Sequence, residues 1–197
     1  MPKRQEIKEY NLMLQKYSVK KALIIFNRTV CNQEENLSAF ILALSKRFIF
    51  LQLSNDFMLD GFAIIRLDDF DSIRHSSYER TQRKIFNSEG LLDNGFGFDK
   101  HLPLTSWTDI FKTLKKYDYH VIIEDIYKDE NTSNGYLNFW IGEIKNVTDK
   151  SVSIHNYNPD GILDHKAKNI KFDTISIVKF GDRYSTTFRK YLKVKSK

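Results

Sequence analysis

One arrangement of apolar residues occurs twice in this 197-residue sequence, about one hundred residues apart. Near the C-terminal end, an apolar stretch and a Gly-Asp break precede four residues at i, i+4, i+7 and i+8: Tyr184, Phe188, Tyr191 and Leu192. The same spacing follows a Ser-Ser break earlier in the chain: Tyr78, Gln82, Ile85 and Phe86. This spacing is typical of one face of an amphipathic helix. A chain that repeats its order of elements can adopt only a limited set of folds.

Further correspondences at an offset of one hundred residues indicate an internal duplication. A helix predicted over residues 3–16 matches a second helix, for which Thr105 or Ser106 is the candidate N-cap. Four apolar or aromatic positions recur between the two: Ile7, Tyr10, Leu14 and Tyr17 as Trp107, Ile110, Leu114 and Tyr117. The turn signal Asp60-Gly61 recurs as Asp160-Gly161. We therefore predict two domains, residues 1–88 and 105–197, with a linker over residues 89–104.

Each copy is predicted to contain a helix, five short strands and a second helix. Apolar and β-branched runs between turn signals predict the strands: residues 21–26, 37–44, 48–53, 62–67 and 70–74, then 119–127, 136–147, 151–157, 169–172 and 175–180. Five consecutive strands of this length are expected to curl into a small antiparallel barrel, because closure removes exposed edges. The predicted fold class is mainly β with flanking helices (α+β), arranged as two tandem five-stranded barrels.

The composition favours a globular protein outside the membrane. Hydrophobic residues make up 41% of the chain, which is enough to form a core. No run approaches the ~18 apolar residues of a membrane span, and the N-terminal residues lack the apolar centre of a signal peptide. We therefore expect a cytoplasmic protein. Cys31 is the only cysteine, so neither an intrachain disulfide nor a thiolate metal cage can form.

Several residues of the second copy resemble the Sm-like family of small barrels. Gly142-x-Ile144, Asp149 and Val152-x-Ile154 are similar to the first Sm motif, and Lys179-Phe-Gly181 is similar to the second. A leading helix before five bent strands also resembles, more loosely, the SH3-like barrels. The chain departs from the Sm pattern after the Asp, where Ser151-Val152-Ser153 replaces an RNA-contacting Asn. The C-terminal Arg-Tyr…Phe…Tyr-Leu helix resembles an uncharacterised bacterial protein family, which implies no activity.

Residues suited to catalysis or metal binding do not form a recognisable site in the sequence. Asp68, Asp69 and Asp71 carry oxygen ligands for a hard cation, but strand alternation turns Asp68 away and no calcium-type loop surrounds them. The five histidines are scattered, and serine nucleophile elbows and phosphate loops are missing. We predict a solvated acidic turn, no metal, no cofactor and no enzymatic activity.

Two modes of binding stay open. In the first, the protein is a regulatory or protein-interaction module, and exposed aromatic residues anchor an unknown protein partner: Trp107, Trp140, Tyr136 and Tyr157. In the second, RNA or a nucleotide binds to basic helix faces and nearby loops: Arg80, Arg83, Lys84, Lys179, Arg183, Arg189, Lys190 and Lys193. Five cations within residues 189–197 account for most of the net charge of +6. Homo-dimerisation through open barrel edges is a further expectation.

Overall fold

The computed structural model describes residues 4–128 and 135–193, in which strands predominate. The first half, residues 4–88, contains two helices and five strands: α1 (Arg4–Val19), β1 (Leu23–Val30), β2 (Gln33–Leu44), β3 (Phe48–Asn55), β4 (Met58–Arg66), β5 (Ser72–Arg74) and α2 (Ser77–Ser88). The second half, residues 105–193, repeats this order: α3 (Trp107–Lys116), β6 (His120–Lys128), β7 (Gly135–Val147), β8 (Ser151–Asn156), β9 (Lys168–Lys171), β10 (Ile175–Phe180), α4 (Arg183–Phe188) and a 3₁₀ turn, Arg189–Tyr191.

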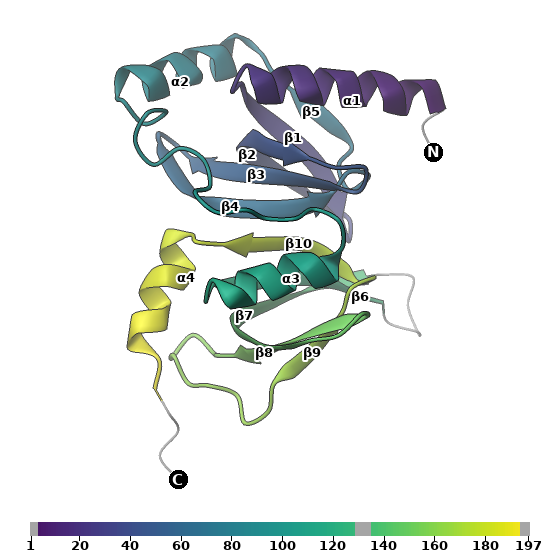
Figure 1. Cartoon of the computed structure of the whole chain (residues 1–197), viewed down its shortest axis with the longest axis vertical. Coiled ribbons are helices and arrows are strands. Elements are labelled where there is room, and N and C mark those ends of the chain that lie inside the picture. The colour runs from purple at the N-terminus through teal and green to yellow at the C-terminus, as the bar shows by residue number, and fades with distance from the viewer. Residues whose placement is uncertain (1–3, 129–134, 194–197) are drawn as a thin grey trace.

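All ten strands belong to one antiparallel sheet, and the prediction of two separate five-stranded barrels is wrong. The strand order is β5-β1-β2-β3-β4-β10-β6-β7-β8-β9, and the sheet does not close. Strands β4 and β10 join the halves through the pairs Phe62–Phe180 to Ile65–Ile177. The free backbone groups of β4 are thus paired by the other half of the chain, so the first half need not close on itself. Figure 1 shows β10 lying directly below β4, with α1 and α2 at the far end of the first half.

The main apolar core lies at the junction of the two halves. Phe48, Phe50 and Ile64 from the first half share one buried cluster with Trp107 and Phe180 from the second. Phe98, in the predicted linker, also packs against this cluster, 5.5 Å from the ring of Phe50 and 5.8 Å from that of Phe180. Burial of aromatic surface on this scale holds the halves together.

Asp60-Gly61 does not form the turn predicted from its sequence, because it lies within β4. The chain instead reverses between β3 and β4 at Asp56, whose φ of +51° is left-handed. Gly61 has a φ of +71°, and a Cβ atom there would lie 2.5 Å from the backbone nitrogen of Asp182. The absence of a side chain therefore lets the start of α4 approach β4 closely.

Helices α2 and α4, which follow the last strand of the first and second halves, bury only part of their predicted apolar faces. Helix α2 buries Glu79, Gln82 and Phe86, whereas Tyr78 is exposed. In α4, Tyr184 is exposed, while Phe188 stacks on Tyr157 at a ring distance of 5.3 Å. Both helices are short, so tertiary contacts rather than periodicity decide which side chains are covered. None of the described helices is long and apolar enough to cross a membrane.

Candidate ligand-binding pocket at the junction of the two halves

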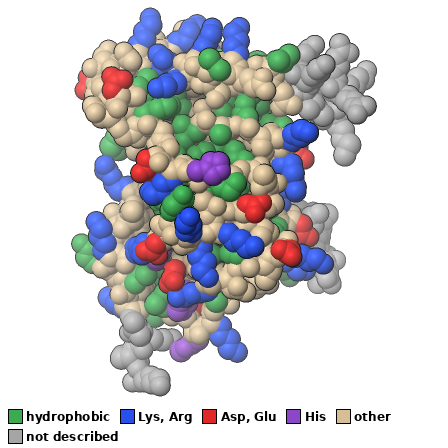
Figure 2. All heavy atoms as spheres, viewed as in Figure 1, with side chains coloured by type: hydrophobic (Ala, Val, Ile, Leu, Met, Phe, Trp, Pro, Cys, Tyr) green, Lys and Arg blue, Asp and Glu red, His purple; other side chains and the backbone are tan. Residues whose placement is uncertain are grey.

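The two predicted basic helix faces do not meet. Helix α2 packs on β1 and α4 on β6, and four strands separate β1 from β6 in the sheet. Several of their cations are also engaged within the protein. Arg83 donates to the carbonyl of Lys21 at 2.7 Å, and Arg189 pairs with Asp118. Figure 2 shows Lys and Arg side chains spread over both halves with acidic side chains among them. Within residues 4–128 and 135–193, the cations of the two helices therefore do not form one continuous surface.

The remaining cations predicted for this surface either contact other groups of the protein or are exposed. Lys179 lies inside the sheet and pairs with Glu124 at 2.7 Å and with Glu35 at 3.6 Å. Arg80 donates to the carbonyl of His75 at 3.5 Å. Four others are exposed: Lys84, Arg183, Lys190 and Lys193. The basic tail beyond them, with Lys195 and Lys197, lies outside the described residues.

Two of the four predicted partner-binding aromatics are not exposed. Only 4% of the surface of Trp107 and 3% of that of Tyr157 is exposed, so the prediction that they anchor a partner on the surface is wrong. The sequence does not distinguish an exposed aromatic residue from a buried one, and large aromatic residues also form cores. Trp140 is half-buried and its Nε1 donates to Asp125 at 2.6 Å. Tyr136 alone among the four is exposed.

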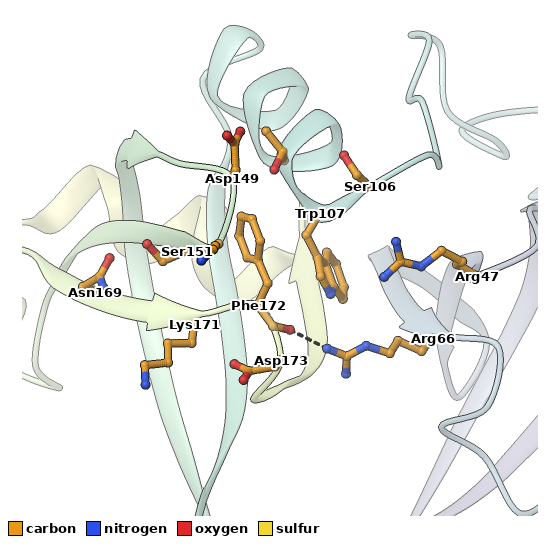
Figure 3. Close-up of a pocket in the computed structure, with 12 residues that line it drawn as sticks. Arg47, Arg66, Ser106, Trp107, Asp149, Ser151, Asn169, Lys171, Phe172 and Asp173 are labelled. Carbon is orange, nitrogen blue, oxygen red and sulfur yellow. Dashed lines mark hydrogen bonds between the residues drawn. The ribbon is translucent and has the colours of Figure 1, made fainter.

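A pocket of about 880 Å³, hereafter the junction pocket, opens where the two halves meet. Twelve residues from turns, strands and the start of α3 line it: Arg47, Arg66, Ser106, Trp107, Thr108, Asp149, Lys150, Ser151, Asn169, Lys171, Phe172 and Asp173. Figure 3 shows Arg47 and Arg66 reaching from the first half toward Trp107 and Phe172 of the second. The pocket therefore exists only because β4 and β10 pair.

Arg66, the last residue of β4, is fixed across the junction. Its guanidinium donates to the backbone carbonyls of Phe172 and Ile175 and lies 3.4 Å from the carboxylate of Asp69. Burial raises the pKa of Asp69, although the charge of Arg66 opposes this effect. Arg66 also lies 5.8 Å from the centre of the Trp107 ring. Because its donors are largely engaged, Arg66 supplies a fixed positive charge more than free hydrogen bonds.

Trp107 places an unpartnered donor at the wall of the junction pocket. It is the first residue of α3, whose N-cap Ser106 accepts from the backbone nitrogen of Asp109 at 3.1 Å. Its ring is buried against Phe48 and Phe111, at 4.8 and 5.7 Å. The buried indole Nε1, however, has no hydrogen-bond partner among the residues that the structure describes, and Figure 3 shows it on the side of the ring toward Arg66. An unpaired buried N–H is costly, which makes this atom a candidate ligand contact.

The lining of the junction pocket carries an excess of positive charge. Four cations face it, from the β2–β3 turn, the end of β4, the β7–β8 turn and β9: Arg47, Arg66, Lys150 and Lys171. Two carboxylates oppose them, Asp149 and Asp173, which leaves a formal charge of +2. Arg47, Lys150 and Lys171 are exposed at their ends and free to reorient toward a ligand. The arrangement suits an anion with several acceptor oxygens.

The ionisable groups of the lining are of two kinds. Its ionisable groups are cations and two separate carboxylates, with no histidine or cysteine. Over residues 4–128 and 135–193, no group of three or more His, Cys, Asp or Glu side chains could hold a metal ion. The predicted acidic turn is engaged in part, since Asp69 contacts Arg66. The side chains of the lining can contact a ligand through charge and hydrogen bonds.

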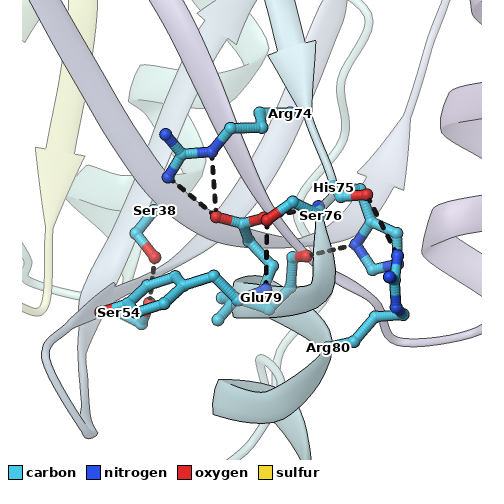
Figure 4. Close-up of polar contacts among 9 residues, drawn as sticks. Ser38, Ser54, Arg74, His75, Ser76, Glu79 and Arg80 are labelled. Atoms are coloured by element: carbon cyan, nitrogen blue, oxygen red, sulfur yellow. Dashed lines mark hydrogen bonds and ion pairs between the residues drawn. The ribbon is translucent and has the colours of Figure 1, made fainter.

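A second polar cluster, at the start of α2, is structural. Glu79 is fully buried, and its carboxylate accepts from the backbone nitrogen and hydroxyl of Ser76 at 2.6 and 2.7 Å and from Arg74 at 2.8 Å (Figure 4). Ser76 in turn caps the helix, so the pair forms a capping box. Burial raises the pKa of Glu79, but these hydrogen bonds outweigh it and lower the pKa to about 2.

The sequence did not predict a shared site for the residues of the junction pocket, which lie in separate segments. Trp107 was predicted as a partner-binding residue, and Asp149 belongs to the segment that resembles the first Sm motif. One signal was present: each copy has a basic residue in the turn between its second and third strands, Arg47 in Ser45-Lys46-Arg47 and Lys150 in Thr148-Asp149-Lys150. The two basic turns are far apart in the sequence, and the pairing of β4 with β10 brings them to one pocket.

Comparisons with protein-family models, curated proteins and solved structures produced no match to this chain.

Proposed function

We propose that this protein is a non-catalytic binding protein that binds single-stranded RNA at the junction pocket. The observation that carries the proposal is a pocket lined by four cations and by Trp107, whose buried indole N–H has no partner among the described residues. Lys and Arg side chains on separate elements neutralise phosphates, and release of counterions then favours binding. Asp149, in the segment that resembles the first Sm motif, lies on the lining of this pocket, which also supports the proposal. The proposed site differs from the helix faces expected from the sequence.

We further propose that the two halves arose by duplication. Each half has the strand order fifth, first, second, third, fourth: β5-β1-β2-β3-β4 and β10-β6-β7-β8-β9. Duplication would place equivalent turns at one site, since Arg47 and Lys150 occupy the same turn of each half. A strand of RNA crossing the junction would then meet similar cations twice.

The test is fluorescence anisotropy with mixed-sequence single-stranded RNA over a series of salt concentrations. We expect binding that weakens as salt rises, because each phosphate contact contributes about −0.7 to the slope of log affinity against log salt. Changing Arg47, Lys150 and Lys171 to Gln should therefore flatten that slope by about 2. A matched control removes three cations outside the pocket: Arg80→Gln, Lys84→Gln and Lys190→Gln. Equal losses in both variants would refute the pocket as the site, and no binding at low salt would refute the function.

A protein-interaction module is the second candidate function. The observation in its favour is a cross-strand pair on β6 and β7, Tyr127 and Tyr136, with 56% and 54% of their surfaces exposed. Exposed tyrosines offer apolar area and a hydroxyl to a protein partner. If a second copy of the chain is that partner, sedimentation velocity should show association that Tyr127→Ser with Tyr136→Ser abolishes. A single species across the concentration range would argue against self-association.

A further inference from the structure

We propose that the junction pocket recognises a phosphate monoester, carried either by the 5′ end of an RNA or by a free nucleotide. This inference rests on the proposed function and names the chemical group that the pocket selects. It is carried by the charge of the lining, by the position of the Trp107 nitrogen and by the burial of the Trp107 ring.

The charge of the lining matches a dianion better than a monoanion. The lining itself, with four cations and two carboxylates, has a formal charge of +2, and Asp69 pairs with Arg66 from outside the lining. A phosphate monoester carries about −1.5 to −2 at neutral pH, whereas a phosphodiester within an RNA strand carries one negative charge. A monoester therefore neutralises the site more completely. Asp149 and Asp173 lie on the second-half side of the pocket, away from Arg47 and Arg66 (Figure 3).

The donors around the pocket match the oxygens of a terminal phosphate. The Trp107 Nε1 is buried and unpartnered, so an acceptor must come to the end of the pocket to meet it. A terminal phosphate presents three free oxygens, and a diester presents two. Arg47 and Lys171 are free to meet the other oxygens, while Arg66 stays bound to backbone carbonyls and contributes charge.

The burial of the Trp107 ring excludes recognition by stacking on it. Phe48 and Phe111 already pack against the indole, so a base cannot lie on its face. The N–H edge is itself buried, and it can serve only as a donor to an acceptor atom, not as a face for an aromatic ring. The remaining volume, out of about 880 Å³, is lined by polar side chains, including Ser106, Thr108 and Asn169, which can meet the rest of a nucleotide.

The test compares two RNAs of about 12 nucleotides that differ only in their 5′ end, a phosphate or a hydroxyl. Both carry a 3′ fluorophore, and affinity is measured by anisotropy with the full chain. We expect the 5′-phosphate RNA to bind at least ~10-fold more tightly, as charge-assisted hydrogen bonds to the extra oxygens favour it. Trp107→Phe, which removes the N–H, should reduce this preference below ~3-fold. Trp140→Phe is the matched control, because its indole nitrogen is paired with Asp125 away from the pocket.

Competition with free nucleotides distinguishes the two sources of the monoester. A mixture of nucleoside 5′-monophosphates should displace the 5′-phosphate RNA, and the same mixture of nucleosides should not. Arg47→Gln gives a second variant, since its exposed side chain can change without disturbing the core. Loss of the preference in Arg47→Gln supports the inference even where Trp107→Phe fails to fold.

The outcomes separate the inference from the proposed function. Equal affinity for the two RNAs overturns the inference and leaves RNA binding standing. Binding of nucleoside monophosphates without any RNA binding supports the inference and overturns the RNA function. A full preference that survives both Trp107→Phe and Arg47→Gln overturns the inference. Binding of neither RNA nor nucleotide overturns both.

Discussion

Replacing Glu79 with Gln tests how far one buried carboxylate stabilises the first half. The pKa of Glu79 is lowered from its ordinary 4.5 to about 2 by hydrogen bonds from Ser76 and Arg74. Since a tenfold change in an acid constant is worth ~1.4 kcal/mol, ionised Glu79 contributes about 3 kcal/mol to stability at neutral pH. A Gln side chain keeps the shape but has one acceptor oxygen, so it cannot serve both Ser76 and Arg74. We expect Glu79→Gln to lower the free energy of unfolding by about 3 kcal/mol at pH 7.

The effect of Glu79→Gln must also depend on pH in a defined direction. Because the folded pKa is lower than the unfolded pKa, the contribution is complete well above pH 4.5 and is lost as pH falls toward 2. Urea unfolding of both proteins should therefore show a difference that narrows by about 2 kcal/mol between pH 7 and pH 3. Glu89→Gln, at an exposed position after α2, should change little at any pH. A Glu79→Gln difference that stays constant with pH would refute the role of the charge.

Three further substitutions probe packing and burial, each by urea unfolding. Gly142→Ala places a Cβ 2.0 Å from the carbonyl oxygen of His155 on β8, so we expect the free energy of unfolding to fall by at least about 2 kcal/mol. Gly95→Ala is the control: its Cβ meets no neighbour, so the substitution should cost only the ~1 kcal/mol of a left-handed backbone. Arg28→Met removes a buried cation that pairs with Glu35 at 3.2 Å and bonds Ser176, and should cost about 2 kcal/mol. Tyr157→Phe removes a buried, unpartnered hydroxyl whose burial raises its pKa, so stability should be unchanged or up to about 1 kcal/mol higher. A clear loss in Tyr157→Phe would mean that the hydroxyl has a partner.

The order of the elements could be predicted from local patterns. Periodic apolar residues and the Ser106 cap predicted α3, and the turns at Ser45-Lys46-Arg47 and Thr148-Asp149-Lys150 were placed correctly between strands. The Gly61 position was not predictable, because a left-handed Gly serves equally in a turn and in a strand that another backbone approaches.

The partner of β4 could not be predicted from its sequence. Its residues Phe62–Ile65 carry the same apolar pattern whether they pair with β5 of the same half or with β10 of the other. Sheet register depends on which face is buried, and both pairings bury these side chains. The burial of Glu79 was likewise not predicted, because it depends on the tertiary contact with Arg74 as well as on the local capping box with Ser76.

The pairing of β4 with β10 links the fold to the proposed function. It aligns Arg66, at the end of β4, with the carbonyls of Phe172 and Ile175, which hold its guanidinium beside Trp107. Two closed barrels would satisfy each edge within one half, and the guanidinium would then have no fixed place in the other. A single open sheet instead shares one core and one pocket between the halves. The backbone pairing that makes the sheet continuous therefore also brings charged residues of both halves together around the junction pocket.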